Sequence, residues 1–182
     1  MKVFINPGHA LGGDPDPGAG GNGMRECDIA MTVGALAGKY LTAAGCEVDL
    51  LQSDNLMGES PDYPCVVSTA NASGADVFVS IHCNAGGGHG TEVEVYDNSG
   101  GQSVQLAECI LAQITDSVGT TRRGINSRSG LAVLRGTTMP AVLVELAFID
   151  TAADANLLAN CQDDFARSIA RGITDYERMV IA

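Results

Sequence analysis

The chain has 182 residues, 45% of them hydrophobic, which is enough to bury the core of one domain of ordinary size without disulfide bridges. It carries 22 acidic and 10 basic residues, a formal net charge of −12, and no Trp. This balance argues against a nucleic-acid-binding protein, because phosphate binding needs a basic face. No apolar run approaches the roughly 20 residues of a membrane span, so we expect no membrane segment.

Apolar runs with strand character alternate along the chain with runs of helical period, such as Leu106, Ile110 and Ile114. In chain order we expect a strand at Lys2–Asn6, a helix at Glu26–Ala44 closed by Gly45, a strand at Glu47–Leu51, a helix at Tyr63–Ser73, strands at Asp76–Ile81 and Thr91–Tyr96, a helix at Gln102–Val118, strands at Leu131–Leu134 and Ala141–Leu146, a helix capped by Asp150 or Thr151 that runs to Ala159, and a helix at Phe165–Val180. This alternation predicts an α/β fold. We expect a single domain over residues 1–182, with a mostly parallel, twisted sheet of about six strands and helices on both faces.

The cysteines and the N-terminus indicate where the chain is made. None of the six cysteines forms a CxxC pair, and several lie in apolar runs, so we expect free, mostly buried thiols and synthesis in a reducing compartment. The segment Met1–Asn6 lacks the apolar stretch of about 7–15 residues that a secretory signal needs. We therefore expect a chain that is made in the cytoplasm without a signal peptide.

Three polar clusters are expected at one edge of the sheet, because sites in parallel α/β folds gather beyond the carboxyl ends of the strands. The segment Asn6–His9 follows the first strand, Ser80, His82 and Asn84 follow the third, and Glu145 lies at the end of the last strand. Glu145 stands inside an apolar run, where a carboxylate is costly unless it is paired or functional.

Two histidines and two glutamates at one sheet edge favour a metal site. Zinc hydrolases commonly hold the ion with three His or Glu ligands and leave one position for water. His9, Glu26 and His82 supply such a set.

Other residues leave two interpretations open. The glycine-rich loop at 12–23 is either a flexible surface loop or a close approach to a ligand, and phosphate cradling is disfavoured because the loop lacks a GxGxxG motif and a P-loop Lys. His89, among glycines, is expected to be an exposed bystander. Four arginines form either a solvated face or a dock for substrate carboxylates: Arg122, Arg123, Arg128 and Arg135.

The chain resembles the zinc-dependent N-acetylmuramoyl-L-alanine amidases of type 3 over essentially its whole length. Asn6–His9 resembles the opening zinc motif of that family, Asp16–Ala19 resembles the loop that follows, and Glu26 stands at the second ligand position. Further segments match in the family's order, namely Ala70–Asn71, Asp76–Ala85, Gly90–Val93, Leu131–Arg135 and Pro140–Ile149. The histidine and glutamate motifs are specific in combination, although each alone would be a weak signal.

The resemblance implies that His9, Glu26 and His82 bind one Zn²⁺ per chain and that Glu145 is the catalytic acid/base. The implied reaction is hydrolysis of the amide between N-acetylmuramic acid and L-alanine in peptidoglycan. The family usually has Asp where this chain has Asn6, so we expect another group to orient His9. Cys65 replaces an Arg that often stands before the Ala-Asn pair, and the segment Leu51–Asp62 is short.

Two alternatives remain beside the amidase. One is a zinc peptidase that cuts within the peptidoglycan stem peptide, and the other is a non-catalytic wall-binding module. The expected place of action is the bacterial cell wall, as for a phage-type endolysin or an isolated catalytic domain. An acidic enzyme is repelled by an anionic wall, so a wall-binding domain in a longer parent chain is also expected.

Overall fold

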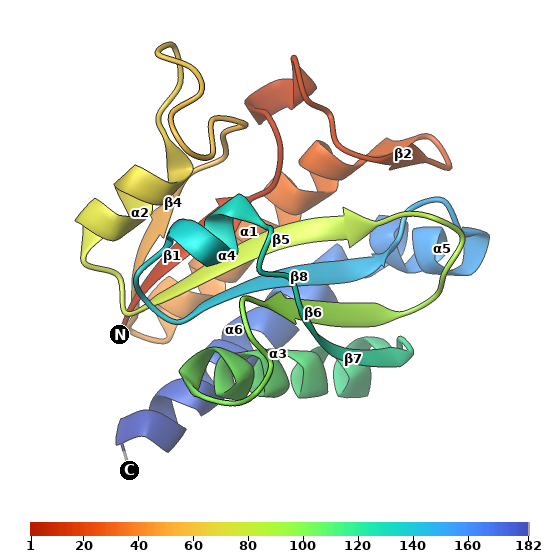
Figure 1. Cartoon of the computed structure of the whole chain (residues 1–182). Helices are drawn as coiled ribbons and strands as arrows, with labels where there is room; N and C mark the ends of the chain where they lie inside the picture. Colours follow the sequence, from red (N-terminus) through yellow and green to blue (C-terminus); the bar gives the residue numbers. More distant parts are fainter. Residues whose placement is uncertain (182) are drawn as a thin grey trace.

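The computed structural model describes residues 1–181, which build a six-stranded sheet in the order β4-β1-β5-β8-β6-β7 (Figure 1). The strands are β1 (Lys2–Pro7), β4 (Glu47–Leu50), β5 (Val77–Asn84), β6 (Thr91–Val95), β7 (Arg122–Ser127) and β8 (Ala141–Phe148). All neighbouring pairs are parallel except β6 and β8. The predicted α/β class with a mostly parallel sheet is therefore confirmed.

Helices cover both faces of this sheet. The larger set packs on one face and consists of α1 (Glu26–Ala43), α3 (Gln102–Val118) and α6 (Gln162–Ile181), with α5 (Ala152–Asn160) beside β8. The other face carries two shorter helices, α2 (Val66–Ser73) and α4 (Ala132–Gly136), which lie above the sheet in Figure 1. A 3-10 turn η1 (Leu11–Gly13) and a small hairpin of β2 (Gly20–Gly21) and β3 (Met24–Arg25) lie between β1 and α1.

Alternation along the strands divides the core into two layers. In β5, Val77, Val79 and Ile81 are buried against the face of α1, α3 and α6, whereas Phe78 is buried under α2 and α4. Successive side chains of a strand point to opposite faces, so each strand contributes to both layers. On the α2 and α4 face the next residues of this alternation are Ser80 and His82, which places polar chemistry beside the smaller core.

For the second half of the chain, one sequence prediction was wrong and one strand was missed. Leu131–Leu134, predicted as a strand, lies at the start of the five-residue helix α4, because so short an apolar run does not distinguish strand from helix. The sixth strand is instead β7, which the sequence analysis missed. It is a polar, largely exposed edge strand with the sequence RRGINS, so it shows no apolar alternation.

The other predicted elements have the predicted type, and any differences are at their ends, whereas the turn η1 and the hairpin of β2 and β3 were not predicted. Helix α2 begins at Val66 and not at Tyr63, because a residue before proline, here Tyr63 before Pro64, is pushed away from helical backbone and Cys65 is still extended. Helix α3 has the predicted bounds. All six cysteines are free, and three of them are buried, namely Cys27, Cys46 and Cys83.

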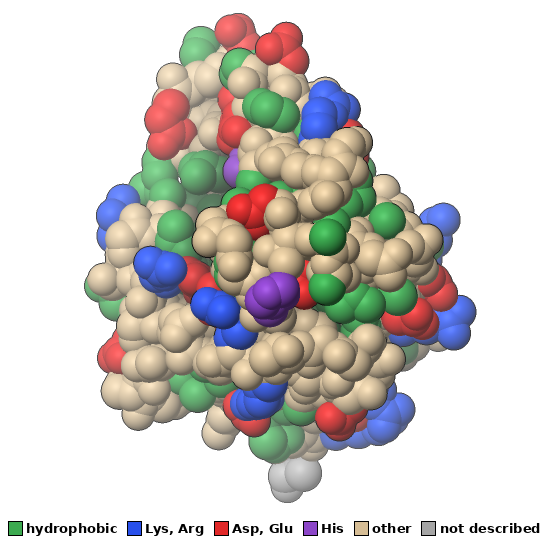
Figure 2. Space-filling model, turned by 90° about the vertical axis from the view of Figure 1, so that its right-hand side faces the viewer, with side chains coloured by type: hydrophobic (Ala, Val, Ile, Leu, Met, Phe, Trp, Pro, Cys, Tyr) green, Lys and Arg blue, Asp and Glu red, His purple; other side chains and the backbone are tan. Residues whose placement is uncertain are grey.

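On the face drawn in Figure 2, several basic side chains gather beside a histidine, and acidic side chains lie among and above them. Within residues 1–181, no helix combines the length and the apolar character needed to cross a bilayer.

Candidate metal centre

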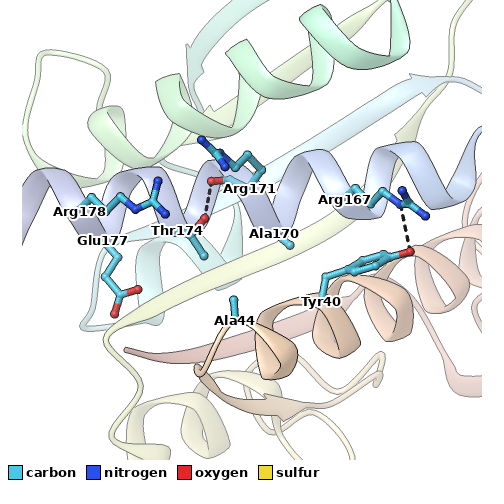
Figure 3. A pocket seen from close by; sticks show the side chains of 8 residues that line it. All are labelled: Tyr40, Ala44, Arg167, Ala170, Arg171, Thr174, Glu177 and Arg178. Atoms are coloured by element: carbon cyan, nitrogen blue, oxygen red, sulfur yellow. Dashed lines mark hydrogen bonds between the residues drawn. The ribbon is translucent and has the colours of Figure 1, made fainter.

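A prominent pocket lies away from the predicted site residues. It has a volume of about 430 Å³ between α1 and α6, and Tyr40 and three arginines are among its lining residues (Figure 3). The arginines are already paired with acids of their own helix, as in Arg167 with Asp163 and Arg171 with Asp175. Because none of the predicted site residues lines it, this pocket is not the candidate site.

The structure brings His9, Glu26 and His82 together at the carboxyl edge of the sheet. One ligand atom from each residue lies within 4.8 Å of the others. Strands β1 and β5 are parallel neighbours, with Pro7 opposite Ile81, so the residues that follow both strands emerge at the same edge. Glu26 is the first residue of α1, where the partial positive charge of a helix N-terminus favours a carboxylate.

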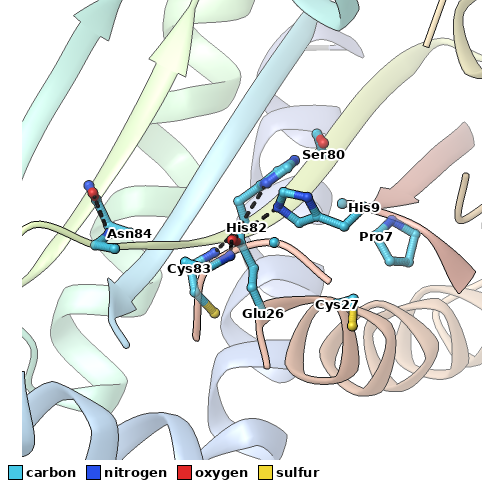
Figure 4. Close-up of polar contacts among 12 residues, drawn as sticks. Pro7, His9, Glu26, Cys27, Ser80, His82, Cys83 and Asn84 are labelled. Atoms are coloured by element: carbon cyan, nitrogen blue, oxygen red, sulfur yellow. Dashed lines mark hydrogen bonds and ion pairs between the residues drawn. The ribbon is translucent and has the colours of Figure 1, made fainter. Parts of the chain in front are cut away.

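The Glu26 carboxylate lies between the two imidazoles (Figure 4). Its Oε1 is 2.9 Å from Nδ1 of His82 and accepts a hydrogen bond from the backbone N–H of Cys83. Its Oε2 accepts the backbone N–H of Ala19 and lies 3.0 Å from Nε2 of His9. Burial raises the pKa of Glu26, but the two histidines outweigh it and hold that pKa well below its usual range, so the carboxylate is ionised.

Asp16 orients His9. Nδ1 of His9 is 2.8 Å from Oδ2 of Asp16, and Oδ1 of Asp16 accepts the backbone N–H of Gly18. Asn6 does not take this part, because its amide donates to the carbonyls of Pro7 and Leu51 and its oxygen accepts from the Ser80 hydroxyl. The expectation of another orienting group is met by an acid seven residues further along the chain.

The donor set fits a metal ion. Nε2 of His9 is buried and makes no hydrogen bond within the described residues, even though Glu26 is near, because the contact lacks hydrogen-bond geometry. Burial lowers the pKa of His9, but the nearby carboxylates of Glu26 and Asp16 prevail and raise it to about 9, so this site favours positive charge. Two imidazoles and one carboxylate are a donor set typical of zinc hydrolases. The group could therefore hold a divalent cation in place of the protons.

Glu145 lies next to this group in the sheet. It is opposite His82 on one side and opposite Glu92 on the other, so the three side chains are in one row on one face. Its Oε2 is buried and has no hydrogen-bond partner within residues 1–181. Burial, together with the charges of Glu26, Glu94 and Glu92, raises the pKa of Glu145 to about 8. A carboxyl with such a pKa is suited to accept and return a proton near neutral pH.

The polar row continues outward from Glu145 to β6, where two buried acids, Glu92 and Glu94, were missed by the sequence analysis. The buried Glu92 accepts hydrogen bonds from Asn84, Arg123 and Asn126. The buried Glu94 is paired with Arg128 at 3.0 Å. The sequence signal that could have revealed these buried acids was their position within the short, otherwise largely apolar strand Thr91–Val95.

The arginines of the predicted basic cluster do not all join the polar row, and His89 lies outside the His9–Glu26–His82 group. Arg122 pairs with Glu108 of α3, so it does not join Arg123 and Arg128 in the polar row. The side chain of His89 is 62% exposed and is not in the His9–Glu26–His82 group, in line with its expected role as a bystander. Its glycine loop is held by Asp150, which accepts the backbone N–H groups of Gly86 and Gly87.

Comparisons with known proteins point to one family. A family model described as N-acetylmuramoyl-L-alanine amidase matches residues 3–175. The chain is 37% identical over 175 residues to the sporulation-specific N-acetylmuramoyl-L-alanine amidase of Bacillus subtilis (strain 168), covering 94% of this chain and 65% of that protein. It is 34% identical over 177 residues to the endolysin of Bacillus phage SPP1, covering 93% of this chain and 62% of that protein. The chain thus spans less than two thirds of the length of these relatives.

Solved structures show the same similarity. N-acetylmuramoyl-L-alanine amidase AmiC2 of Nostoc punctiforme superposes with a TM-score of 0.84 at 31% identity, covering 98% of this chain and 97% of that one. The catalytic domain of the amidase CwlV from Bacillus (Paenibacillus) polymyxa gives a TM-score of 0.82 at 30% identity, covering 97% of this chain and 98% of that one.

Proposed function

This chain belongs to the N-acetylmuramoyl-L-alanine amidase family, and we propose that it is a zinc-dependent hydrolase of the amide between N-acetylmuramic acid and L-alanine in peptidoglycan. The observation that carries the proposal is the convergence of His9, Glu26 and His82 directly beside Glu145. A metal-type donor set next to a carboxyl of raised pKa is the arrangement that metal-assisted amide hydrolysis requires.

His9, Glu26 and His82 would hold one zinc ion per chain. A zinc ion supplies Lewis-acid chemistry, since it lowers the pKa of water from about 15.7 towards about 7 and polarises a carbonyl oxygen. The chain orients the donors through Asp16 on His9 and through the backbone N–H groups of Ala19 and Cys83 on Glu26. Such supporting contacts keep the ligands in place and their loss typically costs metal affinity.

Glu145 is proposed as the acid/base. Its free Oε2 accepts a proton from the attacking water and later donates this proton to the nitrogen of the leaving alanine. Burial and the neighbouring acids keep its pKa near 8 in the metal-free chain, and a cation at His9, Glu26 and His82 would lower that pKa towards neutrality. Both halves of the proton transfer are then accessible at physiological pH.

The bond that is cut distinguishes the amidase from its alternatives. Purified bacterial cell walls are incubated with the zinc-loaded protein, and the new amino termini are identified by labelling and mass spectrometry. We expect free N-terminal L-alanine and no new reducing sugar ends. A peptidase would expose D-glutamate or the diamino acid, and a binding module would pellet with the walls and release nothing. New reducing ends would indicate a glycosidase, which typically uses two carboxylates and no zinc.

We also propose that wall targeting depends on a domain outside this sequence, since the relatives that it matches are longer. A chain with a net charge of −12 is repelled by an anionic wall, and salt screens this repulsion. Pelleting with walls should therefore be weak at low ionic strength and increase with salt. Tight pelleting at low salt would contradict the proposal.

A further inference from the structure

An open polar pocket of about 590 Å³ is lined by Glu92, Arg123, Asn126, Ser127 and Arg128. It adjoins the candidate site through Glu92, which is opposite Glu145 in the sheet. We propose that this pocket binds the free carboxylate on the second residue of the leaving peptide, with Arg128 as the main contact. The inference rests on the proposed amidase function and adds to it the direction in which the substrate lies.

The position of the pocket follows from the strand register. His82 of β5, Glu145 of β8 and Glu92 of β6 form one row on one face of the sheet, and β7 with Arg123 and Asn126 is the next strand outward. Neighbouring strands are about 4.8 Å apart, so β7 lies roughly 10 Å from β8. The long arginine side chains extend back over part of this distance.

Arg123 holds the pocket together with two of its three guanidinium nitrogens, and within residues 1–181 only its Nη2 makes no hydrogen bond. Its Nε donates to Glu92 at 2.8 Å, its Nη1 donates to the carbonyl of His89, and its guanidinium stacks 4.8 Å from the ring centroid of Phe148. These contacts join β7 to β6 and to the glycine loop after β5. Arg123 therefore positions the residues that line the pocket.

Arg128 is anchored but has free donors. Its Nε donates to the buried Glu94, and its backbone N–H donates to the carbonyl of Val95. Its two terminal amino groups make no hydrogen bond with any residue in the range 1–181, and its side chain is 59% exposed. A guanidinium fixed at Nε presents a planar pair of N–H donors, which matches the two oxygens of a carboxylate.

The proposed substrate has a carboxylate at the required distance. The alanine nitrogen is released at Glu145, and the free α-carboxylate of the next residue, D-glutamate, lies at most about 7 Å further along the peptide. The neighbouring acids Glu92 and Glu94 are already paired with Arg123 and Arg128, so they do not repel this group as bare charges would. The leaving peptide then crosses β6 towards β7, and the uncharged glycan lies on the side of β1.

Two soluble substrates that differ in one group test the proposal. Both contain N-acetylmuramic acid linked to L-alanine, and the second residue is D-glutamate in one and its α-amide, D-isoglutamine, in the other. The variants are Arg128→Gln and, as a matched control, Arg122→Gln, which removes the same charge but from the ion pair with Glu108 on α3. Release of N-terminal alanine gives kcat and KM.

We expect the unmodified protein to prefer the acid over the amide by about 10–100-fold in kcat/KM, the usual worth of a charge-assisted hydrogen bond. Arg128→Gln should lose this preference, mainly through KM on the acid substrate, while Arg122→Gln keeps it. The product dipeptide provides a second readout. Calorimetry should show that the acid dipeptide binds more tightly than its amide only when Arg128 is present.

The outcomes separate this inference from the function on which it rests. Alanine release without any preference for the acid, or a preference that survives in Arg128→Gln, overturns the carboxylate pocket and leaves the amidase standing. No alanine release from either substrate by the zinc-loaded protein overturns both. A general loss of activity on both substrates in Arg128→Gln, with equal dipeptide affinities in the unmodified protein, also counts against the pocket.

Discussion

His9 depends on its surroundings more than the other residues of the candidate metal centre. It has a φ of 68°, a left-handed conformation that is unusual for a residue with a side chain. Its ring is held by Asp16 on one nitrogen and faces Glu26 with the other. Strained residues of this kind persist only where neighbouring contacts hold them, and they cluster at functional sites.

The two histidines in β5 and in the following loop give a matched test of the metal proposal. His82→Ala should abolish zinc binding, because two ligands remain and the charge of Glu26 loses its partner. His89→Ala should keep about one zinc per chain, because His89 is exposed and outside the group. Elemental analysis after dialysis measures both variants. Full zinc occupancy in His82→Ala would remove His82 from the ligand set.

Glu145→Gln separates acid/base chemistry from metal binding. The amide keeps the shape of the carboxyl but cannot accept the proton, so kcat should fall by about 10²–10⁴-fold. Zinc content should be unchanged, because Glu145 is not in the His9–Glu26–His82 group. Cleavage at close to the unmodified rate, measured on cell walls, would mean that another group carries the proton.

At the scale of elements, the glycine-rich loop between β1 and α1 forms part of the candidate site. The α-hydrogen position of Gly18 faces the His9 ring and the Glu26 carboxylate, and a Cβ there would lie 2.5 Å from the ring and 2.7 Å from the carboxylate. The loop thus makes a close approach to two side chains of the chain itself, His9 and Glu26, which are proposed metal ligands; its approach to a substrate stays a prediction. His9 lies just after β1, and Glu26 is the first residue of α1, so the loop covers residues that flank it on both sides.

Gly18→Ala should therefore weaken zinc binding and activity by displacing His9 or Glu26. Gly23→Ala is the matched control, because Gly23 also has a positive φ but a Cβ there meets no atom within 4 Å. Both variants bear a similar backbone penalty of about 1 kcal/mol, and only Gly18→Ala adds a clash at the site. Zinc affinity measured by competition with a chelator compares them. Equal losses in the two variants would show that backbone strain alone is responsible.

At the scale of the whole molecule, the burial of Glu145 among other acids affects folding stability. The folded-state pKa of Glu145 is about 8, against 4.5 for an ordinary glutamate. Between these values the folded chain binds a proton that the unfolded chain does not, so the free energy of unfolding falls as pH rises through this window. The full penalty is present above pH 8 and absent below about pH 4.5.

The metal-free Glu145→Gln variant should thus be more stable than the unmodified metal-free chain, by about 1 kcal/mol at pH 5 and roughly 4 kcal/mol at pH 8. Urea unfolding followed by circular dichroism at several pH values measures this difference. Glu108→Gln is the control, because Glu108 is exposed and pairs with Arg122 on the surface. A stability difference that does not change with pH would contradict the raised pKa.

The sequence by itself determined the α/β class, most of the elements and the residue types of the candidate centre. The buried strand Val77–Asn84 is recognisable because it begins with a nearly continuous apolar run, and the helix Gln102–Val118 because its apolar residues repeat with the helical period. The edge strand Arg122–Ser127 and the short helix Ala132–Gly136 have no such period, so pairing and packing with distant segments decided them.

Only the tertiary structure decided which groups support the site. That Asp16 and not Asn6 orients His9 depends on how the glycine-rich loop folds back, and no local pattern encodes that path. The row from Glu145 to Glu92 and the free donors of Arg128 depend on the order and register of β8, β6 and β7. Residue type and spacing limit which chemistry is available, whereas long-range strand pairing sets which side chains meet, because that pairing joins segments far apart in the chain.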